Sequence, residues 1–197
     1  PAIKALLGHR DEQTRVAALR ALVSLDGAES LSAVAEATSD PSLEVRKTAC
    51  LILASSSDPS ANDALLAFAR KAKTIEENSL ALRHCYSRIA TGKVPESDRL
   101  SVLEKLLALS RRPEEKRLAF PELRKLATLK ALRMANSLLS DPVLREEAAD
   151  SSVAIAGALK LEDKKTKQAA IKIMENVIAQ TKNANTREAA EKFIYKH

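Results

Sequence analysis

"DEQTRVAALRAL", residues 11–22, is the clearest copy of a phrase that recurs along the chain. Each copy has a polar start, then a basic residue, then an alanine three positions after the basic residue. Other good copies are "DPSLEVRKTACLIL" at 40–53, "DPVLREEAADSS" at 141–152 and "NANTREAAEKFI" at 183–194. Weaker copies are "EENSLALRHCYSRI" at 76–89, where Asn78 replaces the basic residue, and "RPEEKRLAFPEL" at 112–123. Internal repetition of this kind predicts a repeat architecture.

The phrase reads as the first half of a helix. An Asp or Asp-Pro start caps the free backbone amides of the first turn, and the alanine leaves room for a neighbouring helix. Segments with a helical apolar period lie between the copies, at 28–39, 60–72, 97–110, 128–140 and 163–180. The sequence therefore predicts an all-α chain with two helices per repeat and a period of about 30 residues.

This pattern resembles HEAT repeats, in particular the short bacterial kind related to the phycobilisome-lyase HEAT-like repeats. The resemblance covers essentially the whole chain as about six helix pairs, the first of them truncated, and it is weaker in the third and fourth. It implies a right-handed α-α superhelix whose second helices form a concave row. It also implies a structural role for Arg15, Arg46 and Arg145, which would reach an acidic group or a helix end in an adjacent repeat.

Composition agrees with a folded helical chain. Hydrophobic residues make up 45% and charged residues 29%, with no Trp and only three Phe and two Tyr. No apolar run approaches the roughly 18 residues that a membrane span needs. We expect a single array over residues 1–197, and because the start "PAIKALLG" resembles the end of a helix, we expect it to be a segment of a longer protein. Nothing in the sequence indicates a compartment.

The residues that usually carry catalysis or bind metal are scattered. Cys50 and Cys85 lack a CxxC spacing and are expected to be buried as small hydrophobic residues. None of the three histidines, His84 among them, is part of an HExxH or His-Glu motif. The four glycines form no phosphate-binding loop. We therefore predict a chain that is not an enzyme and that has no cofactor and no metal site.

The net charge of +6 is unevenly distributed. Residues 1–98 hold 12 Lys and Arg against 13 Asp and Glu, a net of −1, whereas 99–133 alone hold 10 against 4, a net of +6. This excess keeps open an alternative function in nucleic-acid binding, similar to the HEAT-like DNA glycosylases with their basic groove. Those enzymes use aromatic residues against the lesion, and here the few aromatic residues fall at packing positions, so we regard nucleic acid as the less favoured partner.

Counting from the basic residue of each phrase predicts which positions point outward. Residues at +3, +4 and +7 are expected to face the core, and those at +1, +5 and +8 to face outward on the concave side. The candidate binding residues on this ridge are Arg20, Lys47, Leu51, Arg83, Arg117 and Arg124. Ser79 and the acidic Glu146 and Asp150 fall on the same ridge. A mixed basic and apolar surface favours a protein or peptide partner, which includes other domains of the same chain, although a solvated face without a ligand remains an alternative.

One residue conflicts with a continuous helix. Pro121 removes a backbone hydrogen bond to the carbonyl of Arg117, at a cost of about 3 kcal/mol in a helix interior. We therefore expect a bend or break between residues 117 and 121, and it is an open question whether this break turns Arg117 and Arg124 toward a partner.

Overall fold

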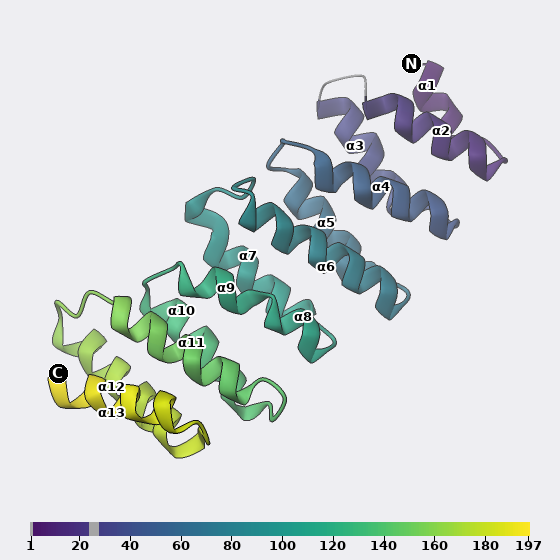
Figure 1. Cartoon of the computed structure of the whole chain (residues 1–197). Coiled ribbons are helices and arrows are strands. Elements are labelled where there is room, and N and C mark those ends of the chain that lie inside the picture. The colour runs from purple at the N-terminus through teal and green to yellow at the C-terminus, as the bar shows by residue number, and fades with distance from the viewer. Residues whose placement is uncertain (1, 24–27) are drawn as a thin grey trace. The chain divides into compact units, whose positions relative to one another are not determined.

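The computed structural model describes residues 2–23 and 28–197 (Figure 1). The described residues form helices and contain no strand, which confirms the all-α prediction. The elements are α1 Ala2–Ala5, η1 Leu6–Gly8, α2 Glu12–Val23, α3 Ala28–Ala37, α4 Leu43–Ser55, α5 Ala61–Lys71, α6 Ile75–Ala90, α7 Glu96–Leu109, α8 Pro113–Arg117, α9 Ala119–Arg124, α10 Leu129–Ser137, η2 Leu138–Ser140, α11 Arg145–Ala158, α12 Lys164–Gln180 and α13 Ala184–Lys196. None of the described helices is long and apolar enough to cross a bilayer.

Every copy of the phrase begins a helix, and every intervening segment is helical. We call α2, α4, α6, the pair α8 and α9, α11 and α13 the motif helices. They alternate with α3, α5, α7, α10 and α12, so the described chain contains six helix pairs, counting α1 and η1 with α2. This alternation is the organisation expected of an α solenoid.

The chain divides into two compact units, made of residues 1–96 with 109–111 and of residues 97–108 with 112–197. In the first unit the motif helices α2, α4 and α6 pack side by side, and α3 and α5 cover them as a second layer (Figure 1). In the second unit α9, α11 and α13 form such a row, and α10 and α12 pack together behind it. The single array over 1–197 stays a prediction.

The alanine of the phrase explains the close packing within each row. It is buried in all six copies, and so is the residue after it in every copy except the last. The six alanines are Ala18, Ala49, Ala81, Ala119, Ala148 and Ala190. The methyl side chain of alanine is small and allows neighbouring helix backbones to approach closely. The repeated alanine therefore helps to set the distance between helices along the row.

The fourth motif helix is broken where the sequence predicts it. Helix α8 ends at Arg117, Leu118 lies in a turn, and α9 begins at Ala119. The N–H of Leu118 donates to the carbonyl of Glu115 at 3.2 Å, which is the tighter bonding of a 3-10 turn. Pro121 is therefore the third residue of a new helix, where a backbone N–H would have no intrahelical partner. The break avoids the cost that Pro121 would impose on a continuous helix.

Both cysteines are free and buried, as expected. Cys50 is 0% and Cys85 is 2% exposed, and burial raises the pKa of each thiol to about 12. At pH 8 only about one thiol in ten thousand would then be the reactive thiolate.

We therefore expect the folded protein to react with Ellman's reagent at least about 100-fold more slowly than the unfolded protein, because the reagent needs an accessible thiolate. The measurement is the absorbance change at pH 8 with and without guanidinium, with both thiols reacting in guanidinium. Rapid reaction of the native protein would contradict the burial of these residues.

Candidate functional site

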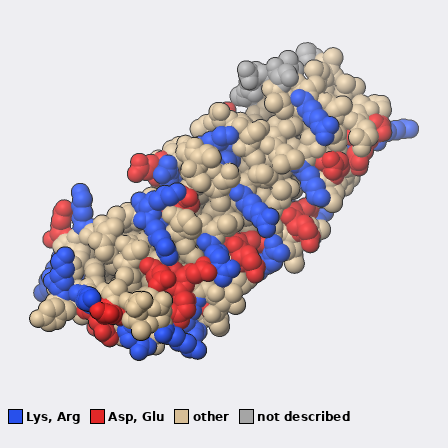
Figure 2. All heavy atoms as spheres, in the orientation of Figure 1, with Lys and Arg blue, Asp and Glu red and all other residues tan. Residues whose placement is uncertain are grey.

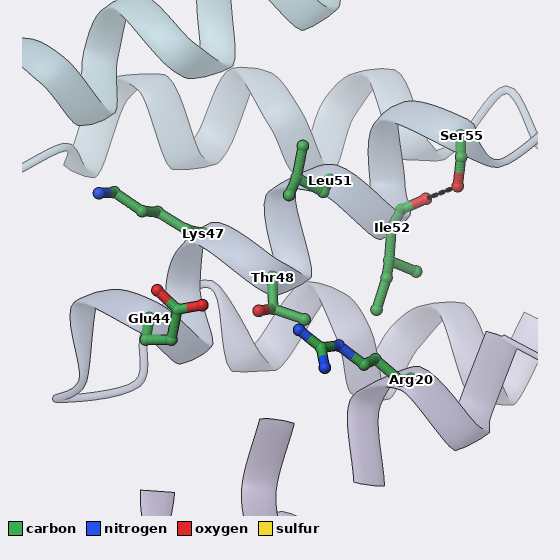
Figure 3. Close-up of a pocket in the computed structure, with 7 residues that line it drawn as sticks. All are labelled: Arg20, Glu44, Lys47, Thr48, Leu51, Ile52 and Ser55. Atoms are coloured by element: carbon green, nitrogen blue, oxygen red, sulfur yellow. Dashed lines mark hydrogen bonds between the residues drawn. The ribbon is translucent and has the colours of Figure 1, made fainter. Parts of the chain in front are cut away.

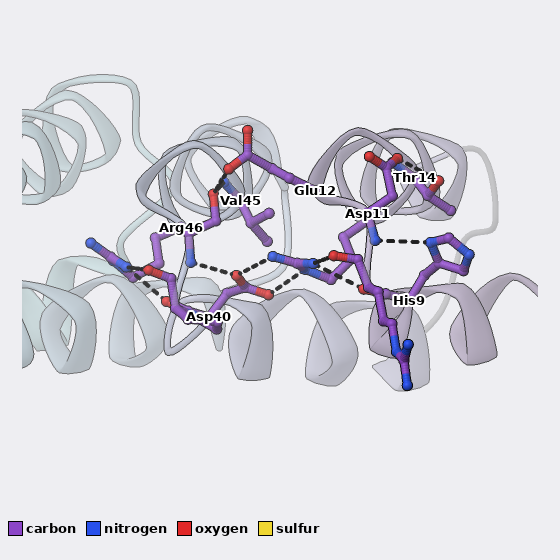
Figure 4. Close-up of polar contacts among 11 residues, drawn as sticks. His9, Asp11, Glu12, Thr14, Asp40, Val45 and Arg46 are labelled. Atoms are coloured by element: carbon purple, nitrogen blue, oxygen red, sulfur yellow. Dashed lines mark hydrogen bonds and ion pairs between the residues drawn. The ribbon is translucent and has the colours of Figure 1, made fainter.

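The basic residues of the phrase form a structural ladder in the first unit (Figure 4). Arg15 donates to the carboxylate of Asp40 at 2.9 and 3.0 Å and to the carbonyl of His9 at 2.9 Å. Arg46 donates to the carbonyl of Asp40 at 2.7 Å and to the carboxylate of Glu77 at 2.7 Å. Each arginine thus joins the turn before its own helix to an acid in the next repeat, as the resemblance implies.

The same donor position differs in the later copies. Arg145 donates to the carbonyl of Leu139 at 3.2 Å, which lies in its own repeat, so its predicted reach to an adjacent repeat is wrong. Arg145 keeps only the hydrogen bond to the carbonyl of the residue six positions earlier. Arg187 makes the equivalent bond, to the carbonyl of Thr181 at 2.8 Å. Asn78 instead donates to the carbonyl of Ala69 at 3.0 Å. The position therefore bonds backbone carbonyls in these three copies. An acid in the next repeat is reached in three of the six copies, by Arg15, Arg46 and Lys116.

Arg46 and Glu77 form a buried ion pair. Their side chains are 8% and 1% exposed, and the closest nitrogen to oxygen distance is 2.6 Å. Glu77 also accepts from the backbone N–H of Lys73 at 2.8 Å and of Thr74 at 3.2 Å, which completes a capping box at the start of α6. Burial by itself would raise the pKa of Glu77, but the bonds from Arg46 and the two amides outweigh it and leave that pKa below its ordinary value of 4.5.

The pKa of Glu77 predicts how acid affects stability. Because the folded-state pKa is depressed, the contribution of Glu77 is complete above pH 4.5 and is lost as the pH falls through the folded-state pKa. We expect the urea midpoint, followed by circular dichroism at 222 nm, to fall below pH 4.5, and to fall less steeply in Glu77→Gln. The control is Glu162→Gln, on an exposed residue, which should keep the wild-type slope. Identical pH profiles for wild type and Glu77→Gln would contradict this assignment.

A second buried cation, Arg88, is not part of the phrase. It is 1% exposed and donates to the carbonyls of Ser56 at 2.5 Å and Asp58 at 2.8 Å and to the side-chain oxygen of Asn62 at 2.5 Å. It also bonds the carbonyls of Leu53 and Ala54 at the end of α4. Sequence reasoning missed Arg88, because an arginine near the end of an amphipathic helix is usually solvated. The only signals in the sequence that could have indicated its burial were the adjacent apolar residue Ile89 and the loop between the two preceding helical segments.

Three of the predicted ridge residues meet around one pocket of about 450 Å³ (Figure 3). Arg20 comes from α2, and Lys47 and Leu51 come from α4. The lining is completed by Glu44, Thr48, Ile52 and Ser55, all on α4. Neither Arg20 nor Lys47 makes a hydrogen bond or an ion pair with any residue that the structure describes. Leu51 is 53% exposed although it lies in the middle of a helix.

The remaining ridge residues differ in how they are used. Arg83 on α6 is exposed and has no partner among residues 2–23 and 28–197. Arg117 lies 2.7 Å from the carboxylate of Glu147 on α11, and Arg124 donates to the hydroxyl of Ser151 on α11 at 3.0 Å. The break at Leu118 therefore accompanies contacts of Arg117 and Arg124 with the adjacent motif helix.

The acidic residues of the predicted ridge also form hydrogen bonds within the protein. Glu146 accepts from the hydroxyl of Thr181 at 2.6 Å and from the backbone N–H of Lys182 at 3.0 Å, and these bonds lower its pKa. Asp150 accepts a hydrogen bond from the hydroxyl of Thr186. Ser79 was expected to face outward but is buried, because +1 positions lie at the border of the packed face. The acidic residues thus hold α11 to the start of α13.

Half of the basic residues in the window 99–133 form ion pairs within the second unit. Five of its ten cations form ion pairs, namely Arg112, Lys116, Arg117, Lys125 and Lys130. On the face shown in Figure 2, Lys and Arg groups alternate with Asp and Glu groups in both units. The described residues contain no cluster of three His, Cys, Asp or Glu side chains that could hold a metal ion.

The chain is similar in fold to solved repeat proteins. A designed armadillo repeat protein in complex with the peptide (KR)4 is 20% identical, with a TM-score of 0.52, and the alignment covers 99% of this chain and 98% of that one. Two others have lower TM-scores: an engineered protein, Target OR329 of the Northeast Structural Genomics Consortium (0.47, 19% identity, 98% and 94% covered), and a second designed armadillo repeat protein (0.46, 20%, 99% and 98%). No curated protein matches the chain.

A family comparison bears on the first part of the chain. The family described as HEAT repeats matches residues 1–82, which contain the first two copies of the phrase and the start of the third helix of the row. The fold of the whole described chain is that of an α solenoid. Over residues 1–82 the chain is similar to HEAT repeats, which confirms the predicted resemblance for this part.

Proposed function

We propose that this chain is a non-catalytic protein-interaction module, a scaffold that binds a segment of another polypeptide on the exposed face of α2, α4 and α6. The observation that carries the proposal is the pocket of about 450 Å³, where two unpaired cations surround an exposed leucine. Elsewhere in the same row, Arg15, Arg46 and Arg88 are fully engaged in structural bonds. Arginine is enriched at protein interfaces, and an arginine left unpaired beside exposed apolar carbon therefore supports a ligand-binding surface.

The kind of chemistry in the pocket supports binding rather than catalysis. Its lining has two cations, one carboxylate, two hydroxyl groups and aliphatic side chains. These groups recognise a ligand by charge and apolar contact, whereas acid–base catalysis needs a base within hydrogen-bond reach of a nucleophile. The designed armadillo protein was solved with a peptide, which is a precedent for peptide binding on this fold.

A selection experiment tests the proposed function. The immobilised chain is offered a phage-displayed library of random 12-residue peptides, and enriched peptides are titrated by fluorescence anisotropy. We expect micromolar to sub-millimolar binding and protection from hydrogen exchange in α2, α4 or α6. If no peptide is enriched, or if every enriched peptide protects only α3 and α5, the proposal is wrong.

Nucleic-acid binding is the second candidate, because of the positive charge at 99–133. The ion pairs within that window weigh against it, since paired cations release few counterions on binding a duplex. The test is a titration of a labelled 20-base-pair duplex at 25, 75 and 150 mM salt. We expect no binding at 150 mM, and sub-micromolar binding there would favour this second function.

A further inference from the structure

We infer that the pocket between α2 and α4 is an acidic-peptide site, which takes a Glu or Asp side chain against Arg20 and Lys47 and an adjacent aliphatic side chain against Leu51 and Ile52. This inference rests on the proposed function and names the chemistry of the partner segment. It concerns only residues of the first unit.

The pocket is made by one helix face and one residue from the neighbouring helix. Its α4 residues fall at 44, 47, 48, 51, 52 and 55, which is the spacing of a single continuous helical face. Arg20 enters from α2, and in Figure 3 its guanidinium lies next to Thr48. A bound segment would therefore lie along α4 and touch α2 at one point.

The charges of the lining favour an anion. Arg20 and Lys47 against Glu44 leave a net charge of 2 − 1 = +1. Hydrogen bonds between a guanidinium or ammonium group and a carboxylate are shorter and stronger than neutral ones. The hydroxyl of Thr48 has no partner among the described residues and adds a neutral donor beside Arg20. The net positive lining of this pocket therefore predicts a preference for an acidic segment over a basic one.

The apolar part of the lining adds a second requirement. Leu51 exposes about half of its surface and Ile52 is half-buried, so both present methyl groups to the pocket. Single exposed apolar residues are common, but here the leucine lies one helical turn from Lys47 and lines the same hollow as Arg20 of α2, and neither cation is paired with a described residue. A volume of about 450 Å³ is at the small end of ligand pockets and is suited to one or two side chains rather than to a folded domain.

The test uses a blocked peptide, Ser-Glu-Glu-Leu-Glu-Ser, titrated into protein labelled at Leu, Ile and Thr methyl groups and followed by NMR. We expect the largest shift changes at Leu51, Ile52 and Thr48, and affinity at least 10-fold higher than for Ser-Gln-Gln-Leu-Gln-Ser or Ser-Glu-Glu-Ser-Glu-Ser. Shift changes confined to other helices, or equal affinity for the uncharged peptide, would overturn the inference.

Charge reversal gives the sharper result. The double variant Arg20→Glu with Lys47→Glu should bind the acidic peptide with at least 10-fold lower affinity. It should gain affinity for Ser-Lys-Lys-Leu-Lys-Ser. The matched control is Lys71→Glu, an exposed lysine on α5 outside the pocket, which should bind like wild type. Arg20→Gln and Lys47→Gln, made singly, replace the double variant if its circular dichroism shows that it does not fold. Unchanged affinity in the variants would overturn the inference.

The outcomes separate this inference from the proposed function. Library peptides that bind α6 or other parts of the row, without any effect of Arg20→Glu with Lys47→Glu, would overturn only the acidic-peptide site. Failure of both the library and the acidic peptide would overturn both. Displacement of the acidic peptide by the 20-base-pair duplex, together with loss of duplex binding in the double variant, would assign the pocket to phosphate groups instead.

Discussion

Replacing Arg88 with methionine should lower the free energy of unfolding by roughly 3–5 kcal/mol, because several hydrogen-bond acceptors lose their donor, and this is a large part of the stability of a typical domain. The side chain is 1% exposed, and its bonds satisfy the carbonyls of Ser56 and Asp58 and the amide oxygen of Asn62. Methionine fills a similar volume but donates no hydrogen bond. Each acceptor left buried without a donor costs about 1–3 kcal/mol.

Urea unfolding followed by circular dichroism measures this effect, and hydrogen exchange locates it. We expect faster exchange at residues 56–62, because Arg88 holds this connection between α4 and α5 in place. The matched control is Arg83→Met on the same helix, an exposed arginine that should change stability by less than about 0.5 kcal/mol. Equal effects of the two substitutions would show that the bonds of Arg88 contribute little.

The ion pair between Arg46 and Glu77 should give the second large effect. Arg46→Met leaves a buried carboxylate without its counter-ion and frees the carbonyls of Asp40 and Pro41, so we expect a loss of roughly 3–5 kcal/mol. Glu77→Gln keeps an oxygen for the amides of Lys73 and Thr74 but leaves the guanidinium unpaired, at a cost of roughly 3 kcal/mol.

The double variant tests whether the two residues act together. Arg46→Met with Glu77→Gln should be less destabilising than the sum of the single changes by about 1–3 kcal/mol, since no buried charge is left unpaired. Lys47→Met, one residue further along α4 and without a structural partner, is the control and should be within about 0.5 kcal/mol of wild type. Strict additivity in the urea midpoints would indicate that the pair makes no net contribution.

Most of the fold could be predicted because its signals are local. The polar start, the basic residue and the alanine three positions later fall within one or two helical turns, so the phrase at 11–22 and its copies identify helix starts and the packed face directly. The break at Leu118 was predictable for the same reason, since Pro121 acts on its own turn. The six ridge residues lie on the motif helices, although their common role in binding stays a prediction.

Which hydrogen-bond or ion-pair partner each polar side chain has was decided by contacts between repeats. Helical spacing placed Arg20, Lys47, Arg117 and Arg124 on the outward side of their helices. Residues of α11 bond the last two, whereas Arg20 and Lys47 have no partner among the described residues of their own repeats. The burial of Arg88 required a loop about 30 residues earlier in the chain to place its carbonyls around the guanidinium. A local pattern specifies which way a side chain leaves its helix, whereas its partner comes from another repeat, and only three-dimensional packing brings the two together.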